Sequence, residues 1–215
     1  MKLQTQRFID RWVGQLLCGV VSGWVRLTGG AAKPVHNPKN ILVILLSEMG
    51  SIVLAGPMFA QIRRQYPGVN IHILQLKKNQ EVSKLLQLTQ PEFMHSLDDR
   101  SGGSLVRDIL AVSRKMRALS LDAVIDCELF SRVSALLSFT TGAPVRVGFT
   151  PHTQEGLYRG SFINHAIPYN PYQHISKQFL ALVDALESAG AMPRTKAASI
   201  RALPSETELR VDFSA

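Results

Sequence analysis

The sequence is poor in cysteine, in acidic residues and in long apolar runs, and each shortage excludes a class of protein. Its 215 residues contain only two cysteines, Cys18 and Cys127. Two distant thiols form neither a disulfide framework nor a cysteine-based metal cluster, and they fit a reducing compartment. No group of His, Cys and acidic residues has metal-ligand spacing either. We therefore expect no metal site.

The shortage of acidic residues makes the chain basic. Twenty-four Lys and Arg against 16 Asp and Glu give a formal net charge of +8. This balance favours an anionic partner, which could be a nucleic acid, an acidic lipid surface or a phosphorylated substrate. The sequence carries no RNP or helix-turn-helix motif and no interleaving of basic and aromatic residues. We therefore rank nucleic acid last and expect no nucleic-acid partner.

The N-terminal region is apolar but too short to cross a membrane. Apolar pairs recur every four residues across residues 8–25, as in an amphipathic helix. Its uncharged part, residues 12–25, falls short of the about 20 residues that a span requires. Asp10 and Arg11 stand directly before it, which disfavours a signal peptide. Two tryptophans and flanking arginines fit a helix lying at a membrane interface, and docking on the domain's own surface is an equal alternative.

The rest of the chain alternates between strand and helix patterns, and its 46% hydrophobic residues exclude global disorder. Strands are expected at 41–46, 69–76, 93–97, 121–125 and 145–149. Helices are expected at 52–66 (starting late or kinked at Pro57), 80–88, 104–119, 130–139 and 175–186. This order predicts an α/β fold with a Rossmann-like, doubly wound, mainly parallel sheet. The predicted organisation is an amphipathic helix (1–30), a linker (31–39), the Rossmann-like domain (40–190) and a second linker (191–215).

Ligands of such sheets bind beyond the carboxyl ends of the strands. This rule points to residues 47–51, 77–79, 126–132 and the segment after Phe149. In the first of these, a tight turn at Gly50 before a helix would let the backbone N–H groups of Met49 and Gly50 face an anion. The turn matches neither the phosphate loop of NTPases nor the glycine pattern of dinucleotide enzymes. An NTPase and a classical dinucleotide enzyme therefore both lack the motif that would be their main support.

The segment ILVILLSEMGSIVLAGPMFAQIRRQYP resembles the opening strand, loop and helix of glycosyltransferase family 9, the ADP-heptose:lipopolysaccharide heptosyltransferase family. The resemblance continues through LDAVIDCELFSRVSALLSFTTGAPVRVGF and HISKQFLALVDAL, and it covers residues 40 to about 190. It implies the N-terminal, acceptor-binding half of a two-domain GT-B enzyme. The chain is then expected to end before the donor-binding domain and to be inactive alone.

The family resemblance also implies the reaction and the place where it occurs. The enzyme would transfer a sugar from a nucleotide-sugar donor, expected to be ADP-linked, to an anionic lipopolysaccharide-type saccharide. No metal or other cofactor is implied. The location would be cytoplasmic, peripheral on the inner face of the cytoplasmic membrane.

One position departs from the family pattern. Ser51 stands where the family carries the Asp proposed as catalytic base, and a serine hydroxyl cannot accept the acceptor's proton without a base of its own. Glu48, in the same loop, is the candidate replacement, with Asp126 and Glu128 as the next candidates. The alternative for Glu48 is a solvated loop carboxylate without a catalytic role. The alternative function is then an inactive Rossmann-like binding or interaction module.

The acceptor is anionic, so basic residues near the strand ends are candidates for binding it. The candidates are Lys77, Lys78, Arg132, Arg146, His152 and Arg159. Each has a structural alternative: the lysines could be solvated, Arg132 and Arg146 could pair with Asp126 or Glu128, and His152 and Arg159 could be ordinary surface residues. His165 is expected in the irregular segment over the cleft, and His174 at the start of a helix.

Overall fold

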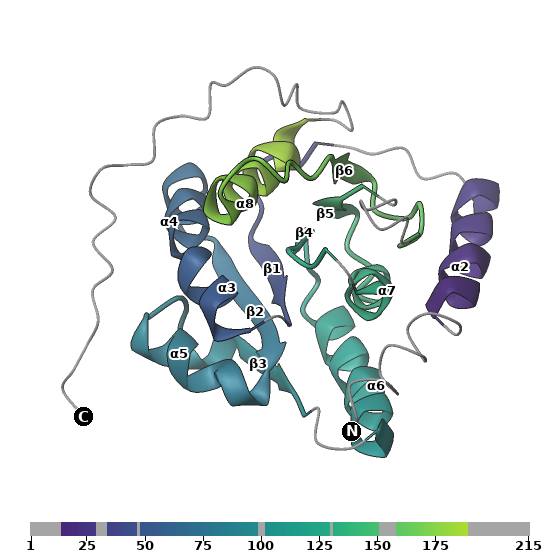
Figure 1. The fold of residues 1–215 in the computed structure, drawn as a ribbon, viewed down its shortest axis with the longest axis horizontal. Helices are drawn as coiled ribbons and strands as arrows, with labels where there is room; N and C mark the ends of the chain where they lie inside the picture. The colour runs from purple at the N-terminus through teal and green to yellow at the C-terminus, as the bar shows by residue number, and fades with distance from the viewer. Residues whose placement is uncertain are drawn as a thin grey trace.

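The structure, a computed structural model, describes residues 14–28, 34–46, 48–98, 102–129, 131–150 and 158–188, with backbone only for residues 28 and 102–108. A six-stranded sheet runs through it, with helices on both faces (Figure 1). The strands are β1 (Asn40–Leu45), β2 (Asn70–Leu76), β3 (Met94–Leu97), β4 (Ala123–Asp126), β5 (Val145–Phe149) and β6 (His165–Ile167). Their order is β3-β2-β1-β4-β5-β6, and every pairing among them is parallel. The predicted Rossmann-like, doubly wound α/β fold is confirmed.

Helices follow the strands in the expected alternation. The α-helices are α2 (Gln15–Thr28), α3 (Met49–Leu54), α4 (Gly56–Gln65), α5 (Gln80–Leu85), α6 (Gly102–Ala118), α7 (Arg132–Thr140) and α8 (Ile175–Asp184). Three 3-10 turns accompany them: η2 (Lys77–Asn79), η3 (Pro91–Phe93) and η4 (Ala185–Glu187). All five predicted strands are present, with ends shifted by at most two residues.

The helix predicted at 52–66 is two helices. The first runs from Met49 to Leu54, and the second follows from Gly56 with Pro57 in its first turn. Proline lacks the N–H that a helix interior needs, but it is tolerated in a first turn, where no partner is required. The predicted break near Pro57 is therefore confirmed, whereas the predicted late start is wrong.

β6 is a strand that the sequence pattern did not predict. It has only three residues and begins with His165, so it shows neither an apolar run nor an alternation. Parallel pairing with β5 defines it, in the register Val147↔His165 to Phe149↔Ile167. The bond from Thr150 N to Ile167 O (2.8 Å) extends this pairing by one residue.

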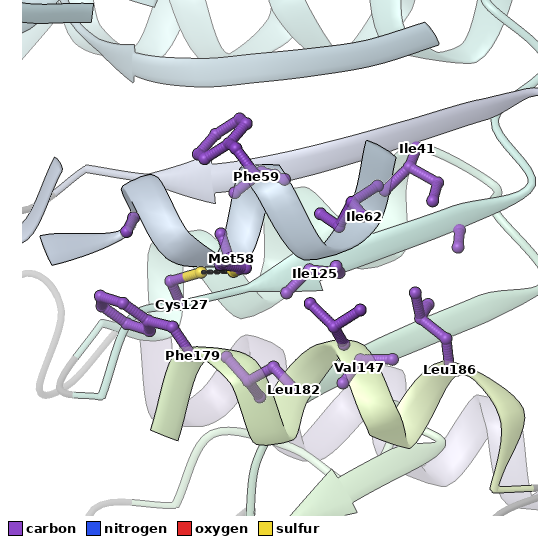
Figure 2. Packing of buried hydrophobic residues seen from close by; sticks show 14 of the residues in the cluster. Ile41, Met58, Phe59, Ile62, Ile125, Cys127, Val147, Phe179, Leu182 and Leu186 are labelled. Atoms are coloured by element: carbon purple, nitrogen blue, oxygen red, sulfur yellow. Dashed lines mark hydrogen bonds between the residues drawn. The ribbon is translucent and has the colours of Figure 1, made fainter. Parts of the chain in front are cut away.

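One face of the sheet is covered by α3, α4, α5 and α8. Figure 2 shows α4 and α8 packing their apolar side chains over strand residues such as Ile125 and Val147. Met58 of α4 lies over the exit of β4, with its sulfur 3.9 Å from that of Cys127. This is the larger of the cores, and it closes the α4 and α8 side of the fold against water.

The other face is covered by α6 and α7, with α2 outside α7 (Figure 1). Met116 of α6 and Leu137 of α7 pack on Ile44 and other apolar strand residues. Cys18 of α2 is buried in a third, smaller cluster that includes Ala135 of α7. On this side, α2 therefore forms a second helical layer outside α7.

The predicted N-terminal helix is confirmed over Gln15–Thr28, while residues 1–13 lie outside the described part. Ser22 Oγ accepts hydrogen bonds from Tyr158 Oη (2.8 Å) and from Ser161 N (2.9 Å). The helix is therefore docked on its own domain, which was one of the two alternatives. Within the described residues, no helix is both long enough and apolar enough to cross a bilayer.

The described part of the first predicted linker is attached to the domain. Val35 is buried in the larger core, and its N–H donates to Leu186 O at 3.2 Å. This segment therefore runs along the domain between α2 and β1. The second predicted linker, residues 191–215, lies outside the described residues.

Candidate functional site

The strand order reverses at β1, which makes its carboxyl end the topological switch point of the sheet. The chain goes from β1 outward to β2 and β3 on one side, and then returns to β4 and β5 on the other. Connections leaving neighbouring strands on opposite sides leave a crevice between them, and this is where ligands of open α/β sheets bind. The loops after β1, β2 and β4 are the ones that meet at this switch point.

The loop after β1 presents a carboxylate to solvent. Glu48 is exposed, has an extended backbone and precedes α3, and its side chain makes no capping hydrogen bond to that helix. Met49 and Gly50 form the first helical turn. The tight turn expected at Gly50 is wrong, because Gly50 is helical and has no positive φ. Ser51 is half-buried, and its N–H donates to Glu48 O at 3.0 Å.

Two lysines lie beside this loop. Lys77 and Lys78 are exposed on η2, directly after β2. β2 pairs with β1 in the register Leu45↔Gln75, so the lysines and Glu48 extend from the same edge of the sheet. Both loops therefore lie at the carboxyl edge of the sheet, and binding of the acceptor by these lysines stays a prediction.

At the carboxyl end of β4 the polar groups are buried and paired. Asp126 and Arg159 are each 0% exposed, and Asp126 Oδ2 lies 2.5 Å from Arg159 Nη2. Ser134 of α7 donates to the same carboxylate oxygen at 3.1 Å, and the Glu128 N–H donates to Oδ1 at 3.1 Å. Arg159 Nε also donates to Ser131 O at 3.0 Å. This network fastens the start of the segment after residue 157 to β4 and α7.

Asp126 is not accessible to an acceptor hydroxyl. Burial raises the pKa of its carboxyl group, and the Arg159 charge and the hydrogen bonds from Glu128 N and Ser134 oppose that rise. Both of its oxygens already accept hydrogen bonds. Glu128 is 9% exposed, and its Oε1 accepts from Leu46 N at 2.7 Å, which joins the ends of β1 and β4. Of the three candidate bases, Glu48 is the exposed one.

The structure places the candidate arginines in structural contacts. Arg132 is 3% exposed and donates from Nε to Tyr158 O at 2.7 Å. Arg146 lies in the first half of β5, away from the carboxyl edge, and donates to Phe162 O (2.8 Å) and Ala143 O (2.5 Å). Burial lowers the pKa of Arg146. The structure thus does not bring Arg132, Arg146 and Arg159 together with the lysines as an open cationic surface, and acceptor binding by them stays a prediction.

The histidines separate into three cases. His152 lies outside the described residues. His165 is buried in β6, with Nδ1 2.8 Å from Ala185 O, and does not lie in an irregular segment as expected. His174 is the N-cap of α8, as predicted, and accepts from Ser176 N. Among the described residues, no three His, Cys, Asp or Glu side chains gather as metal ligands would.

Ser131 and Ser134 belong to the buried network, and sequence reasoning missed them. Ser131 caps α7 by accepting from Ser134 N at 3.2 Å, which gives it a local signal at a helix start. The partner of Asp126 had no such signal, because Arg159 is 33 residues away in the chain. Pairing of an arginine with Asp126 was considered for other arginines, and the fold selects Arg159.

Comparisons with known proteins identify the class of fold. No family model and no curated protein matches this sequence. Solved structures match with 17–18% identity, so the likeness concerns the fold. They are glycosyltransferases of family 9 and heptosyltransferases, and the chain has the Rossmann-like fold of one part of them.

Three of these structures give the extent of the likeness. The family 9 glycosyl transferase from Veillonella parvula matches with a TM-score of 0.56 and 17% identity over 71% of this chain and 42% of its own. The E. coli heptosyltransferase WaaC with ADP-2-deoxy-2-fluoro heptose gives 0.55 and 18% over 73% and 50%. The E. coli ADP-heptose lps heptosyltransferase II gives 0.51 and 18% over 72% and 44%. The matched region thus spans half or less of each of these proteins.

Proposed function

We propose that this chain supplies the acceptor-binding half of a family 9 glycosyltransferase. The observation that carries the proposal is the coincidence of two features at one place. The fold is that of part of the family 9 enzymes and heptosyltransferases, and its switch point exposes Glu48 next to Lys77 and Lys78. A carboxylate beside cationic groups suits deprotonation of a hydroxyl on a phosphorylated saccharide.

The donor would be a nucleotide-linked sugar. Two of the similar structures are WaaC with ADP and WaaC with ADP-2-deoxy-2-fluoro heptose. By analogy we propose an ADP-linked heptose-type donor, held by a second half of the enzyme, and no metal or other cofactor. We further propose a cytoplasmic protein peripheral on the inner face of the cytoplasmic membrane, where a lipopolysaccharide-type acceptor is reached.

The chemistry assigned to this half is general-base catalysis. Glu48 would accept the proton of the acceptor hydroxyl as that oxygen attacks the anomeric carbon, and the nucleoside diphosphate would leave with the bonding electrons. Ser51 would orient the same hydroxyl by a hydrogen bond. Lys77 and Lys78 would hold the acceptor's phosphate groups.

Binding by the 215-residue chain tests the assignment of this half. In calorimetric titration, a phosphorylated lipid A–Kdo-type saccharide should bind, and ADP-heptose should not. Lys77→Gln/Lys78→Gln should weaken acceptor binding by about tenfold, since each exposed charge contributes on the order of 1 kcal/mol or less. Two exposed charges on α4 and α8, away from the carboxyl edge of β2, provide the matched control, Arg64→Gln/Lys177→Gln. Binding of ADP-heptose but not of the saccharide would assign this half to the donor.

The second candidate function is a binding module without catalysis, and the observation that favours it is Ser51 at the position of the family's Asp. The two candidates differ in turnover and not in acceptor binding. Sugar transfer by a protein carrying both halves excludes the inactive module. The 215 residues alone should bind the acceptor without transferring sugar.

A further inference from the structure

A stripe of apolar side chains is exposed along α2. The described residues include nine large apolar side chains that are exposed, and five of these lie on this one helix: Leu16, Leu17, Val20, Trp24 and Leu27. Leu16, Val20, Trp24 and Leu27 are spaced by four, four and three residues, so they share one face of the helix. Their exposed fractions are 69%, 65%, 64% and 87%.

This stripe is not the face by which α2 docks on the domain. The docked face carries Cys18, which is fully buried, and Ser22, which is hydrogen-bonded to Tyr158 and Ser161. At 100° per residue, the two faces lie on roughly opposite sides of the helix. α2 is therefore apolar on both sides, and only one side is accounted for by the fold.

On the helices of this side of the sheet, the described exposed charges are of one sign. α2, α7 and α6 lie on the same side of the sheet (Figure 1). Their described side chains include the exposed cations Arg26, Arg114, Lys115 and Arg117 and no acidic residue. The helices of the other face, with the turn η4, carry acidic side chains among their cations, namely Glu81, Asp184 and Glu187.

We propose that the exposed stripe of α2 docks on a bilayer containing anionic lipids, with the basic residues of α2 and α6 facing the headgroups. The apolar side chains would enter the headgroup and acyl boundary, and Trp24 and Arg26 have the amphipathic side chains that suit this depth. The membrane-bound helix is fixed to the domain through Ser22 and Cys18. Docking therefore holds the α7 and α6 side of the whole domain at the membrane surface. The inference assigns a surface to the peripheral location proposed above, and its test does not require sugar transfer.

Vesicle binding tests the proposal directly. The chain should co-sediment with vesicles of 70% phosphatidylcholine and 30% phosphatidylglycerol at 100 mM NaCl, and much less with pure phosphatidylcholine. Val20→Ser/Leu27→Ser should lower the partition coefficient about tenfold or more, because it removes apolar area from the stripe. Leu85→Ser/Tyr172→Ser removes two exposed apolar residues elsewhere and should leave binding unchanged.

The charge contribution is tested in the same assay. Arg114→Gln/Arg117→Gln should weaken binding to the phosphatidylglycerol vesicles about tenfold, whereas Arg64→Gln/Lys177→Gln should change it little. The chain has two tryptophans, so Trp12→Phe leaves Trp24 as the only reporter. Its fluorescence should shift to the blue and become protected from acrylamide on binding. Unchanged circular dichroism melting shows that each variant is folded.

Three outcomes would overturn the proposal. The first is no binding of the wild-type chain to the phosphatidylglycerol vesicles. The second is equal loss of binding in the stripe variants and in their controls. The third is a lipid-free dimer in analytical ultracentrifugation that Val20→Ser/Leu27→Ser abolishes, because the stripe would then be covered by a second copy of the chain.

Discussion

The charged residues at the carboxyl edge differ in solvent exposure between the two sides of β1. On the β2 side, Lys77 and Lys78 are exposed at the carboxyl edge, while the histidines His72 and His95 are buried inside the fold. On the β4 side the edge carries a buried ion pair, Asp126 with Arg159. The charged side chains are therefore exposed on one side of β1 and enclosed on the other.

The difference separates residues available for binding from residues that maintain the fold. An exposed charge can exchange water for an anionic ligand, whereas the carboxylate of this buried pair is enclosed and both of its oxygens already accept hydrogen bonds. Polar residues after parallel strands look alike in a sequence. The exposed lysines are candidates for binding, whereas the buried pair of Asp126 and Arg159 supports the loop that contains it.

The largest effect is expected at the exposed carboxylate between the two sides. In a protein that carries both halves, Glu48→Gln should lower turnover about 10²–10⁴-fold, the usual contribution of a general base, with little change in acceptor affinity. Steady-state kinetics with an ADP-linked sugar and a phosphorylated acceptor measure this. Because Glu48 is exposed, the melting temperature should stay the same.

The exposed carboxylate of η3, changed in Glu92→Gln, is the control and should leave turnover intact. Ser51→Ala should reduce turnover much less than Glu48→Gln, and Ser51→Asp should be tolerated because it restores the family's residue. Intact turnover in Glu48→Gln together with complete loss in Ser51→Ala would move the base to another residue and refute this assignment.

The next effect is on stability and concerns the β4 side. Arg159→Met should lower the free energy of unfolding by about 3–5 kcal/mol, because it leaves Asp126 buried without its partner. Urea denaturation at pH 7.5 measures the loss. The exposed Arg64 gives a matched control, and Arg64→Met should change stability by no more than about 0.5 kcal/mol.

A double variant sharpens this test. Asp126→Leu/Arg159→Met removes both charges, so it should be more stable than Arg159→Met alone. If the double variant lost as much stability, relative to the wild type, as Asp126→Leu and Arg159→Met together, the two residues would not be coupled. The β4 edge could then no longer be described as held by an ion pair.

The smallest expected effect concerns the buried histidines of β2 and β3. His72 Nδ1 lies 3.2 Å from His95 Nε2, and burial, with the charge of Lys115 and then His72, lowers the pKa of His95 to about 4. Between the ordinary value of 6.5 and this value, the unfolded chain binds more protons than the folded one. The stabilisation is therefore complete above pH 6.5 and is lost as the pH falls toward 4.

One variant and one control test whether His95 causes this loss of stability at acid pH. Between pH 7.5 and pH 4.5, the wild-type chain should lose about 1–3 kcal/mol more stability than His95→Leu does. The exposed His36 provides the control, and His36→Gln should follow the wild type. Equal acid sensitivity of wild type and His95→Leu in urea titrations would show that the histidine pair is not its source.

Much of the fold could be predicted because its signals are local. A buried parallel strand such as Ile41–Leu45 reads as a continuous apolar run, and Pro57 marks a helix break wherever the chain goes. β6 escaped prediction because its three residues become a strand only by pairing with β5. The start of α3 at Met49 was also missed, because no capping side chain at this helix start gives a local sequence signal.

The sequence by itself determined the alternation of strands and helices, and hence the parallel sheet, because these follow from periodicity and from the handedness of parallel connections. The same alternation points to the carboxyl edge, where ligands of such sheets generally bind. The sequence also singled out Glu48, Lys77 and Lys78 as polar residues at that edge. Only the tertiary structure decided which polar residues are solvated, since the pairing of Asp126 with Arg159 joins positions 33 residues apart. Burial depends on neighbours that the fold brings from distant parts of the chain, and no local pattern records them.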